Sequence, residues 1–525
     1  MTTNTPPQAN MSPPRRGLMR SGLVVSAMTM LSRVMGLVRD VVVATFLGAG
    51  NGADAFFVAF KIPNFLRRLF AEGAFNQAFV PVLSEYSTQR SKQEIRELLN
   101  AVAGSLTAIL ALITAFAMLG APWLVWVFAP GFGRDPEKLA MTADMLRLTF
   151  PYLLLISLTA FAGSVLNTWN RFAVPAFTPV LLNLSLIGAA LLLMPLMEEP
   201  AMALAWGVLI AGAAQLVFQV PFLLRLGLLP TPWPNFAHEG VKRILKLMAP
   251  ALFGVSVSQI NLLLDTVLAS LLVAGSVSWL YYSDRLVELP LGVFGVAIGT
   301  IILPALSKRH AEQSNEHFAA MLDWAVRVVL LLGVPAALAL AVLAEPFLIT
   351  LFHYGAMTDH DIQMAAMSLR AYAFGLVAFM LIKVLAPGFF ARQDTKTPVK
   401  VGIIAMVANM VFNLLLVWPL AHAGLALATA LSAFLNAGLL GYLLYRQKVL
   451  VFQPGWGRYA VQLVGGSALM SVALYIASPE WHAWLEFELW QRIRWVAGLV
   501  VLGGGLYFIW LTALGLRLRH FKMNS

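Results

Sequence analysis

The sequence predicts an all-α protein that crosses a membrane many times, with about fourteen transmembrane helices. The chain has 525 residues, of which 59% are hydrophobic and only 12% charged, and its mean hydropathy is +0.78. Soluble proteins carry about 25% charged residues. Apolar runs of about 20 residues, each long enough to cross a bilayer as a helix, recur from Leu23 to Leu516. No run alternates apolar and polar residues, which argues against an outer-membrane barrel.

The first span starts directly after a basic N-terminal segment that resembles a signal peptide. Because the helical pattern continues past Arg33 to Gly48, we expect a transmembrane helix here. The chain has no cysteine, so it has no disulfide and no thiolate metal site. Polar, Pro- and Gly-containing breaks place the expected spans near residues 23–48, 54–86, 98–128, 140–168, 172–195, 201–225, 241–271, 275–306, 318–344, 361–390, 399–418, 422–445, 459–477 and 493–515.

The distribution of basic residues predicts that both termini lie in the cytoplasm. With this topology, 22 Lys and Arg residues fall in cytoplasmic segments and 4 in the opposite segments, as the positive-inside rule requires. The net charge of +11 therefore does not indicate nucleic-acid binding. The cytoplasmic residues are Arg15, Arg16, Arg20, Arg90, Lys92, Arg96, Arg171, Arg225, Lys242, Arg243, Lys246, Lys308, Arg309, Arg392, Lys396, Lys400, Arg446, Lys448, Arg458, Arg517, Arg519 and Lys522, and the others are Arg134, Lys138, Arg492 and Arg494.

An internal repeat divides most of the chain into two units. The segment PWLVWVF at 122–128 is matched by PFLITLF at 346–352, and PVLS at 81–84 is matched by PALS at 304–307. The first pair of segments is 224 residues apart, and the second pair, like Arg147 and Arg370, is 223 residues apart. Six spans per unit predict two parallel units, with a substrate site between them near mid-membrane. We expect a tail at 1–20, an N-lobe at 21–230, a C-lobe at 231–450, and a helix pair with a cytoplasmic tail at 451–525.

Charged residues interrupt the first two spans of each unit. One charge at the bilayer centre costs about 2.5–3.5 kcal/mol, so the set is tolerable only if it faces water or is paired. Span 54–86 is about 50 Å long at 1.5 Å per residue and must bend or tilt, and Pro63 supplies a bend. Its charges at 54, 61 and 68 share one helix face. The charged residues within the spans are Arg33, Arg39, Asp40, Asp54, Lys61, Arg67, Arg68, Glu72, Asp265, Asp284, Arg285 and Glu288.

The arginines favour an anionic, amphiphilic substrate. Guanidinium groups from several helices suit the oxygens of a pyrophosphate, and the acids would moderate the charge of the empty cavity or carry H⁺ or Na⁺. Asp265 stands alone in QINLLLDTVLAS and is a candidate site for a coupling cation; the alternative is a packing Asp bonded to a neighbouring Ser or Asn. The alternative for the whole set is interhelical ion pairing, as in Arg68–Glu72, Arg33–Asp40 and Asp284–Arg285.

Three segments together resemble the MurJ (MviN) lipid II flippases, within the superfamily of MATE exporters and polysaccharide flippases. The resemblance implies two six-helix lobes, a C-terminal pair that forms a groove, and a bacterial inner-membrane location. It implies that the chain moves undecaprenyl-pyrophosphate-linked peptidoglycan precursor (lipid II) to the periplasmic leaflet by alternating access, for cell-wall synthesis and cell shape. The segments are LSRVMGLVRD, ADAFFVAFKIPNFLRRLFAEGAFNQAFVPVLSEY and SWLYYSDRLVELPLGVFGVAIGTIILPALS.

The resemblance also assigns roles to individual residues. Family cavity arginines match Arg33, Arg39, Arg67 and Arg285, and a Na⁺ site of some members involves an acid where Asp265 falls. Matching Na⁺ ligands on the eleventh span do not stand out, which leaves coupling to membrane potential, H⁺ or Na⁺ open. No cofactor is expected. The expected partners are lipid II, membrane lipids and cell-wall synthesis or division proteins. Lys61, Asp54, Asp284 and Glu288 match further charged positions of the family.

Two rival functions can be compared with this one. A related exporter of polysaccharide-lipid or drugs shares the repeat but does not need the arginine cluster. A membrane enzyme acting on lipid pyrophosphates needs an exposed acid or a metal cluster, whereas the expected outer loops are short and no His/Asp/Glu metal spacing occurs. The sequence therefore favours a transporter, with no enzymatic activity.

Overall fold

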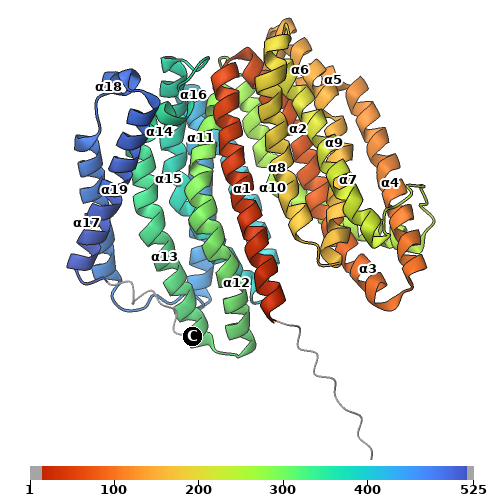
Figure 1. The fold of residues 1–525 in the computed structure, drawn as a ribbon. Coiled ribbons are helices and arrows are strands. Elements are labelled where there is room, and N and C mark those ends of the chain that lie inside the picture. The colour runs from red at the N-terminus through yellow and green to blue at the C-terminus, as the bar shows by residue number, and fades with distance from the viewer. Residues whose placement is uncertain (1–14, 517–525) are drawn as a thin grey trace, which may run out of the picture.

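The computed structural model describes residues 15–516, and these residues form helices joined by short connections (Figure 1). No strand occurs among them, as the sequence predicts. The first half comprises α1 (Arg15–Leu47), α2 (Asn51–Arg67), the π-helix η1 (Arg68–Phe75), α3 (Asn76–Gln89), α4 (Lys92–Leu119), α5 (Ala121–Phe128), the 3₁₀-helix η2 (Pro130–Arg134), α6 (Pro136–Thr149), α7 (Pro151–Thr168), α8 (Ala173–Gly188), η3 (Ala189–Leu193), η4 (Met194–Leu196) and α9 (Pro200–Leu226).

The second half repeats this order and adds a helix pair. Helix α16 bends at Ala421 (φ 47°, ψ −130°) and so contains two helices. The elements are α10 (Glu239–Ser270), α11 (Ser276–Pro290), the π-helix η5 (Leu291–Gly295), α12 (Val296–Ala311), α13 (Asn315–Val342), α14 (Ala344–Phe352), α15 (Asp359–Phe390), α16 (Lys396–Arg446), α17 (Trp456–Ala477), α18 (Trp481–Glu486) and α19 (Leu489–Ala513).

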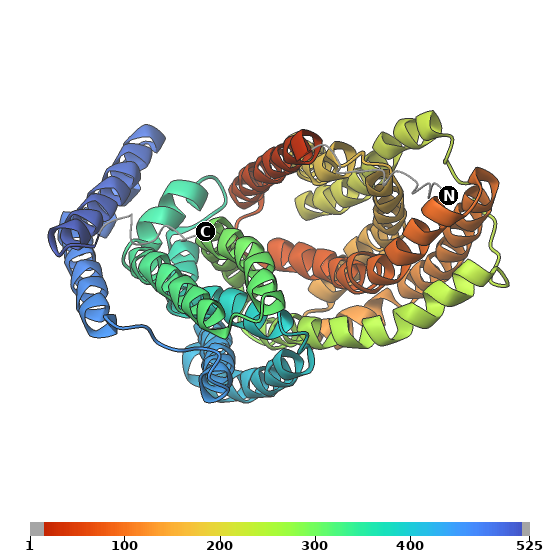
Figure 2. The same ribbon diagram turned by 90° about the horizontal axis from the view of Figure 1, so that it is seen from below.

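The helices form two groups side by side, α1–α9 and α11–α16, with α17–α19 at the outer edge of the second group (Figures 1 and 2). We call the two groups the N-lobe and the C-lobe. Ten helical stretches of the described residues are long and apolar enough to span a membrane, where α16 counts once despite its bend. The chain is thus a polytopic helical membrane protein, and the number fourteen stays a prediction.

Hydrogen bonds and helix boundaries recur in the two halves at positions 223 residues apart, the spacing of the sequence repeat. The Nε of Arg147 donates to the carbonyl of Met118 at 3.3 Å, and the Nε of Arg370 donates to that of Ala341 at 3.3 Å, so donor and acceptor both shift by the offset of the repeat. The π-helices η1 and η5 begin at Arg68 and Leu291, which the same offset relates. Short helices α5 and α14 precede α6 and α15, which begin at equivalent positions of the repeat, Pro136 and Asp359. The two halves therefore share local geometry as well as sequence motifs.

Helix α10 connects the two lobes. It packs against η1, α3 and α4 of the N-lobe and against α16 of the C-lobe. At one end the Arg243 guanidinium on α10 pairs with the Glu85 carboxylate on α3 at 2.8 Å. At the other end the Ser270 hydroxyl accepts a hydrogen bond from the Gly131 amide at 3.2 Å. A movement of one lobe relative to the other must therefore change the contacts of α10.

A buried carboxylate joins the lobes at the end of the bundle where α1 ends and α2 begins. Asp54 on α2, 1% exposed, pairs with the Lys138 ammonium of α6 at 3.1 Å. It also accepts hydrogen bonds from the Gly275 amide (2.8 Å), the Ser278 amide (3.0 Å) and the Ser278 hydroxyl (2.7 Å). An N-lobe side chain therefore caps the first turn of α11 in the C-lobe, where backbone N–H groups lack partners. We call this arrangement the Asp54 clasp.

Close backbone contacts surround the Asp54 clasp. The Tyr282 hydroxyl donates to the Gly48 carbonyl at 3.0 Å, and the Ala356 amide donates to the Thr45 carbonyl at 2.8 Å. Gly355 has φ +56°, and a Cβ built on it would lie 2.2 Å from the Thr45 oxygen. A side chain at this position would force the lobes apart. We call this side of the protein the closed end.

Gly355→Ala is therefore expected to destabilise the folded protein. The substitution adds about 1 kcal/mol of backbone strain in the left-handed region. The new Cβ would also clash with the Thr45 oxygen, so the lobes would have to move apart. The expected result is a lower thermal-unfolding midpoint of the purified protein. Gly402→Ala is the matched control, since no atom lies within 4 Å of its new Cβ on α16 and its φ is ordinary; it should leave the midpoint unchanged or raise it. Equal midpoints for both variants would contradict the close contact.

Candidate functional site

A cavity of about 350 Å³ lies between the two lobes and collects most of the charged residues predicted from the sequence. Walls of α1, α2, η1 and α8 face walls of α10, α11, α15 and α16. We call it the central cavity. Its predicted charged residues are Arg39, Lys61, Arg67, Arg68, Asp265, Asp284, Arg285 and Glu288.

A second cavity of about 450 Å³ adjoins the central cavity and shares Arg39, Arg285 and Glu288 with it. It is lined by α1 and α8 on one side and by α11 and η5 on the other, and Arg33 and Asp40 line it. We call it the side cavity. A Cβ built on Gly292 would lie 1.7 Å from a terminal nitrogen of Arg33, so only glycine allows this guanidinium to cross so close to η5.

The Asp40 carboxylate forms the centre of a cluster that joins α1 to α11. The Arg39 guanidinium donates to it at 2.7 and 3.0 Å, the Tyr281 hydroxyl donates to it at 2.9 Å, and the Arg285 Nε lies 3.3 Å away. Arg39 and Asp40 are 8% and 3% exposed, whereas 34% of the Arg285 side chain is exposed. The Asn183 amide oxygen of α8 accepts from Arg39 at 3.0 Å. A buried carboxylate is thus shared by two arginines from different lobes.

This cluster corrects two ion pairs that the sequence left open. Asp40 pairs with Arg39 and Arg285 rather than with Arg33. Arg285 pairs with Asp40 and, at 2.7 Å, with Glu288, one turn further on the same face, rather than with its neighbour Asp284. Spacing along the chain does not decide these pairs: Asp40 pairs with its neighbour Arg39 and with Arg285 on another helix, because the partner depends on which helices pack together.

Two arginines lie where α2 changes to π-helical geometry. Arg67 closes α2 and donates to the Asn64 amide oxygen at 3.1 Å, and Arg68 opens η1. The departure from α-helical geometry begins shortly after Pro63, where the sequence predicts a bend. Single-turn π-segments often occur at functional sites. The side chain of Glu72 lies outside the described residues, so its predicted pair with Arg68 is not described.

Asp54 shares a helix face with Lys61 in the sequence but lies elsewhere in the structure. It lines neither cavity and forms the Asp54 clasp instead, whereas Lys61 lines the central cavity. Its partner Lys138 falls in an outer segment of the predicted topology, and sequence spacing does not indicate the pair because the two residues are 84 positions apart. Lys383 lines the side cavity, which the sequence does not predict.

Asp265 is hydrogen-bonded to amide and hydroxyl groups, as in the alternative of a packing Asp. The Asn413 amide donates to it at 2.7 Å, and the Thr429 hydroxyl lies at 3.4 Å. The amide oxygens of Asn409 and Asn413 are buried without a hydrogen-bond partner among the described residues. Oxygen atoms of this kind suit a hard cation. The described residues contain no cluster of three His, Cys, Asp or Glu side chains.

Comparisons with known proteins identify the family of this chain. The family model described as lipid II flippase MurJ matches residues 43–493. A probable lipid II flippase MurJ of Haemophilus influenzae is 49% identical over 511 residues, covering 95% of this chain and 100% of the relative. The lipid II flippase MurJ of Burkholderia cenocepacia is 42% identical over 514 residues, covering 97% and 99%.

Solved structures give the same result. A lipid II flippase MurJ in an inward closed conformation superposes with a TM-score of 0.79 at 25% identity, covering 94% of this chain and 98% of that one. An inward-facing MATE-family multidrug transporter superposes with a TM-score of 0.65 at 14% identity, covering 81% and 98%, and so shares the fold. From these matches over nearly the whole length, the chain belongs to the MurJ family of lipid II flippases.

Proposed function

We propose that this chain moves lipid II from the cytoplasmic to the periplasmic leaflet by alternating access, with the head group held in the central cavity. The observation that carries this proposal is the convergence of basic side chains from both lobes on one cavity, with Arg39, Lys61 and Arg67 from the N-lobe and Arg285 from the C-lobe. Guanidinium groups bind phosphate oxygens through paired, charge-assisted hydrogen bonds. A pyrophosphate is the part of lipid II that such a set recognises.

Asp40 links head-group binding to the arrangement of the lobes. In this structure its carboxylate occupies Arg39 and Arg285, which are the groups that a pyrophosphate would use. An incoming pyrophosphate competes with the carboxylate for the same donors, and Glu288 competes for Arg285 in the same way. Binding would therefore exchange contacts between the lobes for contacts with the substrate, which biases the protein toward another conformation.

The side cavity is the proposed passage for the head group. It lies between α1 of the N-lobe and η5 of the C-lobe and leads to Arg39 and Arg285 of the central cavity. A head group that enters between these elements keeps its lipid tail in the bilayer. Arg33 and Lys383 would contact the phosphates first.

We assign the closed end to the periplasm, from the predicted topology with both termini in the cytoplasm. The Asp54 clasp then acts as the periplasmic gate. The location in the bacterial inner membrane, the absence of enzymatic activity and contacts with cell-wall synthesis or division proteins belong to the same proposal. An exporter of polysaccharide-lipid or drugs is the rival that the tests must separate from it.

Asp265, Asn413 and Thr429 would hold a coupling cation, Na⁺ or H⁺, beside the central cavity. The unpartnered amide oxygens of Asn409 and Asn413, as far as the described residues go, support this proposal. A bound cation would supply a positive charge next to the site of the head group. Membrane potential, negative inside, would act on the same charges during the return step.

Arg285→Ala is expected to lower transport strongly. The arginine provides a charged hydrogen-bond partner worth about 2 kcal/mol, or roughly thirtyfold in head-group affinity. The measurement follows externally accessible lipid II in cells whose own flippase is inactivated, at matched protein levels. Arg370→Ala is the control, because this exposed arginine pairs with Glu345 outside both cavities. Failure of the wild-type chain to expose lipid II would favour the rival exporter, and full rescue by Arg285→Ala would assign Arg285 to structure alone.

Asp54→Ala is expected to open the closed end. Removing one partner of a buried ion pair costs about 3–5 kcal/mol, and the first turn of α11 loses its cap. The chain has no cysteine, so Ser276→Cys, at a buried position beside the clasp, gives a single labelling site. Labelling by a membrane-impermeant maleimide from outside should rise in the Asp54→Ala background. Asp135→Ala, which removes the cap of α6 without touching the C-lobe, should leave it unchanged. Equal labelling in both backgrounds would exclude the gate.

Asp265→Asn is expected to remove the cation dependence of transport. In proteoliposomes that contain lipid II, replacing Na⁺ by choline at fixed pH should slow the wild type severalfold if Na⁺ is the cation. If H⁺ is the cation, collapse of an imposed pH gradient should slow the wild type instead. The variant should respond to neither, because it lacks the carboxylate charge that the cation neutralises. A wild type that responds to neither ion would leave Asp265 with a packing role only.

A further inference from the structure

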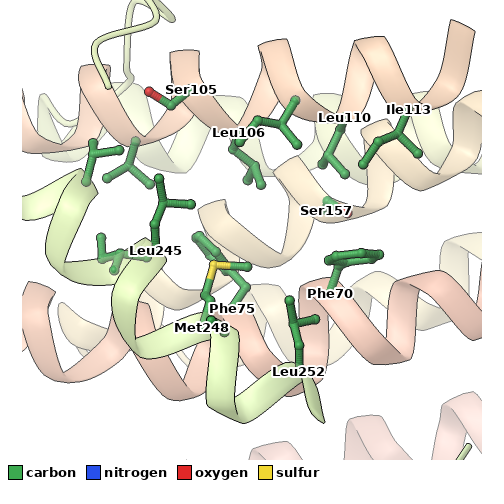
Figure 3. A pocket seen from close by; sticks show the side chains of 15 residues that line it. Phe70, Phe75, Ser105, Leu106, Leu110, Ile113, Ser157, Leu245, Met248 and Leu252 are labelled. Atoms are coloured by element: carbon green, nitrogen blue, oxygen red, sulfur yellow. The ribbon is translucent and has the colours of Figure 1, made fainter. Parts of the chain in front are cut away.

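An apolar pocket of about 200 Å³ lies outside the two charged cavities, on the N-lobe side of α10. Figure 3 shows its side chains on α4, η1, α7 and the first half of α10. Leu106 and Leu110 of α4 face Leu245 and Met248 of α10 across the gap, and Ile109 also lines the pocket. Among the described residues that line it, two serines carry the only polar side chains. We call it the α4–α10 pocket.

The shape of the α4–α10 pocket fits a hydrocarbon chain. Its lining runs from Val102 to Ile113 on α4 and from Val241 to Leu252 on α10, which is about 16 Å of helix at 1.5 Å per residue. One leaflet of a bilayer has about 15 Å of hydrocarbon, half of ~30 Å. The pocket therefore extends over the depth of one leaflet, beginning near the N-terminal end of α10.

Two exposed cations lie at the start of the α4–α10 pocket. Lys242 and Lys246 directly follow the lining residues Val241 and Leu245 on α10, and both are exposed. Neither makes an ion pair within the part of the chain that the structure describes. Lysines near the membrane surface attract anionic lipid head groups, at about 1 kcal/mol each. The pocket thus combines an apolar slot of one-leaflet length with a basic entrance.

We propose that the α4–α10 pocket binds one acyl chain of an anionic phospholipid, with its head group at Lys242 and Lys246. The chain would lie between α10 and the N-lobe, while the other side of α10 contacts α16 of the C-lobe. The bound lipid thereby stabilises the position of the helix that connects the lobes. This site is separate from the charged cavities, and its occupation does not depend on the transport proposal.

The test uses phosphatidylglycerol with a photoactivatable group on its acyl chain, in proteoliposomes that contain the full-length protein. Mass spectrometry of the crosslinked peptides is expected to place adducts on Leu106, Ile109 and Met248. Ile109→Trp fills the middle of the pocket and removes the burial of at least two methylene groups, so labelling should fall by about tenfold. Leu112→Trp is the matched control on the same helix, where Leu112 is 59% exposed and does not line the pocket.

A second pair of variants tests the entrance without altering the pocket. Lys242→Gln/Lys246→Gln should lower labelling by phosphatidylglycerol roughly thirtyfold at low salt, whereas Lys396→Gln/Lys400→Gln, on exposed lysines of α16, should not. Equal labelling of Leu112 and Ile109 in the wild type, or equal labelling by phosphatidylcholine, would overturn the proposal. Loss of the label on adding undecaprenyl phosphate would overturn it too, because the pocket would then hold the substrate's tail.

Discussion

The shared Asp40 carboxylate is the interaction on which the site depends. A membrane interior tolerates buried arginines only when their charge is compensated, and Asp40 compensates one arginine from each lobe. Tyr281 completes the arrangement, since its hydroxyl donates to Asp40 and accepts from Arg39 at 3.0 Å. The same contacts therefore stabilise the buried charges and hold α1 next to α11. In the proposed mechanism a pyrophosphate would replace the carboxylate, because it offers the arginines more negatively charged oxygen atoms.

The internal repeat explains why the charges meet. Two units with the same local geometry, down to the paired arginine–carbonyl bonds at Met118 and Ala341, place equivalent helices on opposite sides of a common axis. The charge-bearing spans of each unit then face each other across it. At the closed end Asp54 accepts a hydrogen bond from Ser278. The two residues are 224 positions apart, so they occupy nearly equivalent places in the two units. The repeat therefore positions a carboxylate against a helix N-terminus.

The sequence predicts composition-dependent features well and pairings poorly. Apolar run length identifies the helices, the motif offset identifies the two units, and the cost of buried charge identifies the charged residues of the central cavity, because each follows from local chemistry. The partners of Asp40, the Asp54 clasp and the Asn413–Asp265 bond depend on how distant helices pack. Asn409 and Asn413 share one helix face at i, i+4, a polar spacing within an apolar span that is the one signal available beforehand.

The hydrogen bonds at the closed end have a total free energy close to the one that a conformational change requires. Six hydrogen bonds of the described residues join the N-lobe to α10 or the C-lobe there: three to Asp54 and one each to Gly48, Thr45 and Ser270. At a net value of about 1 kcal/mol each, they contribute about 6 kcal/mol. A shift from one conformation to the other, from 1:99 to 99:1, needs about 5.5 kcal/mol. In the proposed mechanism, charge-assisted contacts between a pyrophosphate and two or three arginines would supply a similar free energy. A larger apolar contact at the closed end would exceed what the head group could offset, which is a physical reason for the proposed gate to be polar.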